Sequence, residues 1–151
     1  MKKLILASIL FTAFFIPGCN KSDDSFAFCE GCYLSSWEGY FEGNGEYFIY
    51  NSTNGEIYND IEVQINITNK YDSTLAIEVK APGYISESFS TSKKNQAYYI
   101  NIGAGARTLD IGLKKKGNEY KINGTLKLNT YNKVDSTWSV YKSLSFDVYK
   151  Q

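Results

Sequence analysis

Apolar and polar residues alternate almost without interruption from Trp37 to the end of the chain. In the segment 60–68, aliphatic residues at the odd positions are separated by polar residues at the even positions. The same period of two recurs in the segments 74–80, 109–113, 120–128 and 138–148. Successive side chains of a β-strand point to opposite faces, so this pattern predicts strands with one buried and one wet face. No window of about 11 residues after residue 18 sustains a helical pattern, and the chain is therefore expected to be all-β.

Turn-forming residues separate these strands at short intervals. They occur at 43–45, 54–55, 82–83, 103–105 and 117–118, and weaker strands fit at 37–42, 46–50, 84–90 and 98–102. Short links between consecutive strands imply antiparallel neighbours. About eight or nine strands are counted. This number favours an antiparallel up-and-down barrel of about eight strands over residues 33–151, because closure removes exposed strand edges. A β-sandwich is the alternative.

The apolar stripes predict a closed, mainly aliphatic interior. An uncharged interior of this kind would enclose an apolar ligand, held by burial and oriented by tyrosines at the rim. A filled interior would instead leave only the outer surface for function. The residues expected to form the interior are Trp37, Ile61, Val63, Ile65, Ile67, Leu75, Ile77, Val79, Leu109, Ile111, Leu113, Ile122, Leu126, Val140, Leu144, Phe146 and Val148.

The first predicted strand begins Trp37-Glu38-Gly39-Tyr40, which resembles the Trp-bearing first strand of lipocalins. The layout of strands and turns is similar to that of the small calycin-like β-barrel lipoproteins of Bacteroidota. The resemblance covers most of residues 33–151. It implies a lipocalin-like barrel that binds a small apolar ligand.

The N-terminal segment has the features of a secretory signal. Lys2 and Lys3 precede a mainly apolar run from Leu4 to Ile16, which is too short to span a bilayer. The segment ends Ile16-Pro17-Gly18-Cys19 and resembles a bacterial lipobox. This resemblance implies cleavage after residue 18 and acylation of Cys19 with fatty acids such as palmitate. The alternative is an ordinary secretory signal with a cysteine beside it by chance.

Residues 19–32 are expected to be a tether between the lipid anchor and the barrel. Asn20 to Ser25 are polar or charged and have nothing to bury. A Lys or Ser followed by paired acids just after the lipidated cysteine resembles the export signal of surface-exposed lipoproteins in Bacteroidota. This implies a protein anchored in the outer membrane and displayed on the cell surface. A periplasm-facing anchor is the alternative.

The composition excludes several classes of function. The chain has no histidine, which removes the usual general base, a common zinc ligand and the usual partner of a nucleophilic Ser or Cys. Lys2 and Lys3 leave with the signal, so the 16 acidic residues outnumber the remaining basic residues by two. The single basic run, 114–116, is expected at a hairpin tip. We therefore predict no enzyme, no cofactor, no metal and no nucleic-acid partner.

Cys29 and Cys32 form a CxxC pair between the tether and the first strand. A redox pair needs its first cysteine at a helix N-terminus after a strand, and this context is missing. A zinc site would need two more ligands, and the chain offers neither histidine nor a second cysteine pair. A small-loop disulfide or two free thiols are the remaining interpretations.

Two short motifs and several aromatic residues suggest surface functions. Ser73 and Ser136 lie in Asp-Ser-Thr motifs, which resemble the O-glycosylation site of Bacteroidota. Adjacent strand residues face opposite sides, so one member of each aromatic pair should be exposed and able to stack on a sugar or protein. Those aromatic residues are Tyr47, Phe48, Tyr50, Tyr58, Tyr98 and Tyr99. A surface module that binds a protein or a glycan is thus the alternative to the ligand-binding barrel.

Overall fold

The structure is a computed structural model that describes residues 25–51, 54–70, 74–92 and 98–151. Almost all of these residues lie in β-strands, which confirms the prediction of an all-β fold. One short helix, α1 (Leu34–Trp37), precedes the long strands in the described part of the chain. The strands are β1 (Ala27–Phe28), β2 (Gly39–Asn51), β3 (Asn54–Lys70), β4 (Thr74–Ala81), β5 (Ile85–Ser92), β6 (Tyr99–Ile102), β7 (Arg107–Lys116), β8 (Glu119–Asn132) and β9 (Thr137–Lys150).

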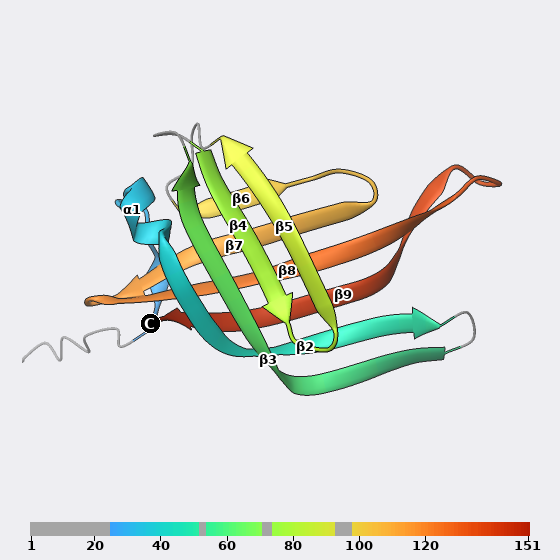
Figure 1. The fold of residues 1–151 in the computed structure, drawn as a ribbon, viewed down its shortest axis with the longest axis horizontal. Helices are drawn as coiled ribbons and strands as arrows, with labels where there is room; N and C mark the ends of the chain where they lie inside the picture. The colour runs from blue at the N-terminus through green and yellow to red at the C-terminus, as the bar shows by residue number, and fades with distance from the viewer. Residues whose placement is uncertain (1–24, 52–53, 71–73, 93–97) are drawn as a thin grey trace, which may run out of the picture.

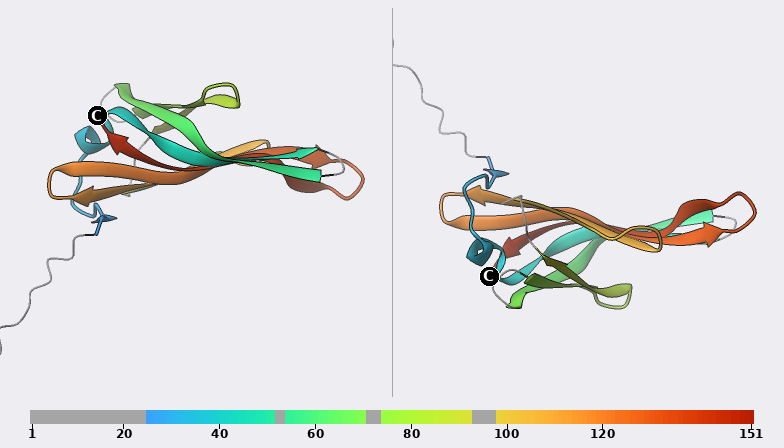
Figure 2. Two further views of the ribbon diagram at one scale, coloured as in Figure 1. Left: turned by 90° about the horizontal axis from the view of Figure 1, so that it is seen from below. Right: turned by 90° about the horizontal axis from the view of Figure 1, so that it is seen from above.

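All described strands belong to one antiparallel sheet with the order β1-β7-β8-β9-β2-β3-β4-β5, and β6 also pairs with β7. Consecutive strands are neighbours from β2 to β5 and from β7 to β9, and β9 pairs back onto β2. The sheet curls into a half-barrel (Figures 1 and 2). In the described residues no ladder joins β5 to β6. The up-and-down order is therefore as predicted, but an open seam between β5 and β6 replaces full closure.

The core lies on the concave side of the half-barrel and follows the predicted stripes. Every predicted interior residue except Val140 is buried, and no polar or charged residue is buried among the described residues. Trp37, the last residue of α1 rather than part of a strand, is fully buried. Further buried residues join this core: Cys29, Cys32, Phe41, Tyr47, Ala81, Ile85, Phe89 and Ile100.

Val140 is the error in the predicted core, because its side chain is 40% exposed. The register explains this result. Leu128 faces Lys142, but the next residue of β8, Asn129, faces Val140, so Tyr141 is an extra, bulged residue of β9. A bulge of one residue reverses the alternation of faces beyond it. Val140 therefore shares the outer face with Asn129, whereas Leu144 remains inside.

The predicted turn at 43–45 is also wrong, because these residues lie within β2. A Cβ atom on Gly43 would lie 2.2 Å from the carbonyl oxygen of Asp147, and one on Gly45 would lie 2.5 Å from that of Ser145. Glycine is needed here because β2 and β9 approach closely, not because the chain reverses. The absence of a side chain serves both purposes, so sequence alone could not distinguish them.

Residues 27–32, which the sequence places in the tether, are part of the packed fold. Ala27 and Phe28 pair with the end of β7. The backbone N–H of Cys29 donates to the carbonyl of Leu113 at 3.0 Å. The side chains of Cys29 and Cys32 are buried. The folded unit thus begins before residue 33.

Candidate interaction surface

Two hairpins extend beyond the barrel, at the end away from α1 and the C-terminus (Figure 1). We call them the β2–β3 arm, residues 47–51 and 54–58, and the β8–β9 arm, residues 129–140. Between the two hairpins, β2 and β9 remain paired as far as Ile49 and Lys142. The arms carry seven exposed large apolar side chains: Tyr50, Ile57, Tyr58, Tyr131, Val134, Trp138 and Val140.

A cross-strand aromatic pair stiffens the β8–β9 arm. Tyr131 lies opposite Trp138, and their ring centroids are 5.0 Å apart. The β6–β7 loop, residues 103–106, packs against this pair. A Cβ atom on Gly105 would lie 2.8 Å from the Trp138 ring, and the side-chain amide of Asn129 donates to the Gly105 carbonyl at 2.6 Å. The indole is thus held in place although half of its surface is exposed.

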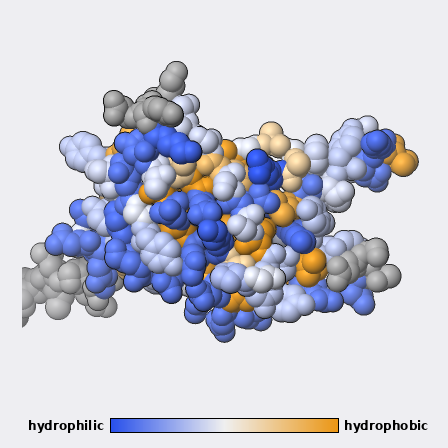
Figure 3. All heavy atoms as spheres, viewed as in Figure 1, coloured by the Kyte–Doolittle hydropathy of each residue, from blue (hydrophilic) through white to orange (hydrophobic). Residues whose placement is uncertain are grey.

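The tip of this arm is ordered by hydrogen bonds to Asp135. Its carboxylate accepts from the backbone N–H and the hydroxyl of Thr137, at 3.0 and 2.6 Å, and from the amide of Asn132 at 3.1 Å. These hydrogen bonds, first that from the Thr137 hydroxyl, lower the pKa of Asp135. Val134 stands at the apex and is 95% exposed. The space-filling view also shows apolar colour at the end of this hairpin (Figure 3).

Three tyrosines gather at the base of the β2–β3 arm. The rings of Tyr47, Tyr58 and Tyr84 lie 5.2 to 6.2 Å apart, measured between centroids. Tyr47 is buried, whereas Tyr58 and Tyr84 are partly exposed. The Tyr58 hydroxyl donates to Glu56 at 2.6 Å, and this hydrogen bond raises the pKa of the phenol. Tyr84 comes from the β4–β5 turn, and no local pattern could have placed it here.

The strand registers put most of the exposed apolar side chains of the two arms on the same side of the sheet. Tyr50 is three residues from the buried Tyr47 and Ile57 lies opposite Phe48, so both point away from the Tyr47 face, whereas Tyr58 lies opposite Tyr47 and shares that face. Beyond the bulge in β9, Trp138 and Val140 also occupy outward positions. The face runs continuously from β3 through β2 and β9 to β8. The arms therefore extend one outer face of the half-barrel with aromatic and aliphatic groups.

The structure places the sequence-predicted sites in different regions. Ser136 lies in the exposed turn of the β8–β9 arm, with a positive φ of 58°. Ser73 and Cys19 lie outside the described residues. Of the aromatic residues singled out in the sequence, Tyr50, Tyr58 and Tyr99 are exposed and Tyr47 is buried. The glycosylation and acylation of these residues stay predictions.

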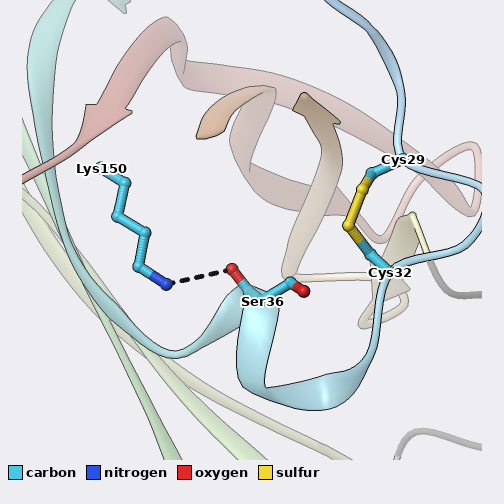
Figure 4. The surroundings of a disulfide bond; sticks show 4 residues. All are labelled: Cys29, Cys32, Ser36 and Lys150. Carbon is cyan, nitrogen blue, oxygen red and sulfur yellow. Dashed lines mark hydrogen bonds between the residues drawn. A yellow bond between two sulfur atoms is a disulfide. The ribbon is translucent and has the colours of Figure 1, made fainter. Parts of the chain in front are cut away.

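Cys29 and Cys32 form a disulfide near α1, which carries Ser36 (Figure 4). Their Cα atoms are 5.3 Å apart. The ammonium of Lys150 donates to the Ser36 carbonyl at 3.3 Å and lies over the rings of Phe41 and Tyr120. These contacts hold α1 and the C-terminal strand together. The disulfide thus lies where the N-terminal segment packs against β7 and the core.

The aliphatic interior is densely occupied by its own side chains. Most of the predicted core residues are 0–1% exposed and pack in one cluster. A hollow of about 650 Å³ is lined by both polar and apolar residues of β3, β4 and β5, together with Ile102, Arg107 and the β6–β7 loop. Arg107 and Glu87 form an ion pair of 2.9 Å beside this hollow.

Comparisons of the chain with protein-family models, curated proteins and solved structures found no match. The described residues contain no helix of sufficient length and apolar character to cross a membrane. Within the same residues, no group of three or more His, Cys, Asp or Glu side chains is arranged to hold a metal ion.

Proposed function

We propose that this chain is a membrane-tethered interaction module that binds a partner protein through its two arms. The observation that carries this proposal is the concentration of exposed apolar side chains on the arms. Exposed aromatic residues on a rigid support are typical of interface anchors, because they bury a large area at a small entropic cost. The aromatic pair and the Asp135 network hold the β8–β9 arm in one conformation before binding, which reduces the cost of association.

The lipocalin-like alternative receives less support from the geometry. An apolar ligand needs space among the aliphatic side chains, and those side chains already contact one another. Titration with an environment-sensitive apolar dye and a panel of fatty acids or sterols tests this alternative. Saturable 1:1 binding by the well-folded domain would favour the ligand-binding barrel over the interaction module.

We further propose that Cys19 is acylated and anchors the module in the outer membrane, on the cell surface. In support, β1 lies at the barrel end that also holds the C-terminus (Figure 1), so an anchor before residue 25 leaves the arms farthest from the membrane. Labelling with a fatty-acid analogue should mark the wild type but not Cys19→Ala. Protease treatment of intact cells should digest a surface-displayed protein and spare a periplasm-facing one.

The arms are tested with a double variant, Val134→Ser with Trp138→Ala, and a control, Ser88→Ala, on the exposed face of β5. A partner recovered by crosslinking on intact cells is purified, and its affinity for each variant is measured. We expect the arm variant to weaken binding at least tenfold, since truncated anchors cost about 2 kcal/mol or more. Equal affinities for the arm variant and the control would disprove a role for the β8–β9 arm.

A further inference from the structure

We propose that the outer wall of the half-barrel binds a neutral oligosaccharide, in a trough that crosses β8, β9, β2 and β3. Two hollows of about 360 and 510 Å³ adjoin there and share Asn44, Gly45 and Asp147. Neither hollow includes a residue of the arms. This site is therefore separate from the proposed protein interface and does not rest on it.

A bulge in β3 shapes the trough. Gly45 lines both hollows with its backbone, and Gly43 lines the larger one in the same way. In β3, the pairing shifts between Tyr58 and Ile61, and Asp60 adopts a left-handed conformation with φ of 55°. Such a bulge bends the strand and re-aims its side chains. Asn59 and Asp60 consequently line the larger hollow.

The trough is lined by short polar groups, namely amides and hydroxyls that both donate and accept hydrogen bonds and carboxylates that accept them. Asp147 lies opposite Asn44 on one neighbouring strand and opposite Asn123 on the other, and Thr125 lies opposite Ser145 in the next row. Amides and hydroxyls of this kind match the adjacent hydroxyl groups of a sugar, which also donate and accept.

An aromatic ring closes one end of the trough. Tyr149 lines the larger hollow and is 44% exposed. Its ring makes an edge-on contact with Phe26, with 5.8 Å between the ring centroids. The ammonium of Lys121 lies 5.4 Å from the centroid of the Tyr149 ring. A fixed and partly exposed aromatic ring beside amides and hydroxyls can pack against the apolar face of a sugar ring while the polar groups bind its hydroxyls.

The charges of the trough argue against other classes of ligand. Glu46, Asp60 and Asp147 line the larger hollow, and Asp147 is paired with Lys121 at 3.0 Å. The carboxylates would repel phosphorylated or sulfated ligands. An apolar ligand would leave the polar lining groups without hydrogen bonds. A cationic peptide remains the rival ligand, and the experiment below separates it from a neutral sugar.

The test uses the chain from Asn20 to Gln151, which retains every described residue. Binding of neutral hexasaccharides of glucose, mannose, galactose and xylose is followed by saturation-transfer NMR and calorimetry, with a lysine-rich peptide as a further probe. We expect at least one hexasaccharide to bind saturably, and Asn44→Ala and Thr125→Ala each to weaken that binding about tenfold. Ser88→Ala and Trp138→Ala, outside the trough, should leave the affinity unchanged.

Three outcomes would overturn the proposal: no hexasaccharide binds, the peptide alone binds, or the two trough variants bind sugar as tightly as wild type. Asn44 and Thr125 are not buried, so both variants are expected to fold, and near-ultraviolet circular dichroism checks this. Because Trp138→Ala affects the arms alone, loss of partner binding and loss of sugar binding are distinguished.

Discussion

At Gly43, the backbones of β2 and β9 approach so closely that any Cβ atom would collide with the carbonyl oxygen of Asp147. The carbonyl belongs to the backbone and cannot rotate away as a side chain could. Gly31 provides a contrast within the same chain, because a Cβ atom added there would meet nothing within 4 Å. The loss of stability caused by adding one methyl group therefore depends on the atoms around the glycine.

We predict that Gly43→Ala lowers the free energy of unfolding by about 1–3 kcal/mol, as expected for overpacking. Gly31→Ala should leave it within about 0.5 kcal/mol of wild type, since nothing is displaced. Urea unfolding followed by tryptophan fluorescence measures both variants. Equal unfolding midpoints for the two would show that β2 and β9 are not as close as described.

Asp135 provides a second prediction at the scale of the residue. Because the Thr137 hydroxyl donates to the charged carboxylate, we expect the pKa of Asp135 to lie below the ordinary value of an aspartate. The ordering of the tip is then complete above the pKa of the unfolded chain, and it is lost as the pH falls through the lower, folded pKa. NMR titration of the Asp135 carboxyl carbon should show the lowered pKa. Thr137→Val should raise the pKa of Asp135, whereas the control Thr130→Val should leave it unchanged.

Among the elements, β9 has two different roles along its length. Its C-terminal half places Leu144, Phe146 and Val148 in the core. Its N-terminal half lies beyond the bulge at Tyr141 and belongs to the exposed arm. One strand thus serves both stability and the proposed binding, and the bulge marks the boundary between the two.

We predict that Leu144→Ala costs about 2–5 kcal/mol of stability, because a fully buried side chain is lost. Val140→Ala, only four residues away, should cost less than about 1 kcal/mol. Differential scanning calorimetry of the two variants compares them directly. A large loss of stability from Val140→Ala would indicate that the bulge is misplaced and that Val140 faces the core.

At the scale of the whole molecule, the half-barrel has two distinct ends. One end joins β1, the disulfide, α1 and the C-terminus, and the other carries the arms (Figure 1). The N-terminal segment contributes to the first end through pairing with β7 and through ring contacts: Phe28 lies 5.4 Å from Tyr98, and Lys114 lies 5.0 Å from the Phe28 ring. Stability should therefore depend on residues before 33.

A truncation series tests this dependence. A chain that begins at Ser25 should melt within about one degree of the chain that begins at Asn20, because it retains the described contacts. A chain that begins at Tyr33 loses β1 and both cysteines and should melt several degrees lower, since about 1 kcal/mol shifts the melting temperature of a small domain by a few degrees. Identical melting temperatures for all three chains would place residues 27–32 outside the folded unit.

The class of fold and most of the core could be predicted from the local pattern of residues. Strand alternation is a local property, so Ile61 to Ile67, Leu75 to Val79 and Leu109 to Leu113 identified their buried faces without any knowledge of neighbours. The same logic failed at Val140, because a bulge is recognised only from the register with β8. It failed at Gly43 as well, because the reason for that glycine lies on β9.

The positions of the candidate surfaces depend on the pairing of strands that are distant in the chain. Tyr84 joins Tyr58, and Gly105 supports Trp138, across large separations in the chain. Asn44, Asn123 and Asp147 meet because three strands pair in a particular register. The open seam between β5 and β6 likewise follows from the pairing of whole strands. Local alternation fixes which face of a strand is buried, whereas the pairing of distant strands fixes which side chains become neighbours.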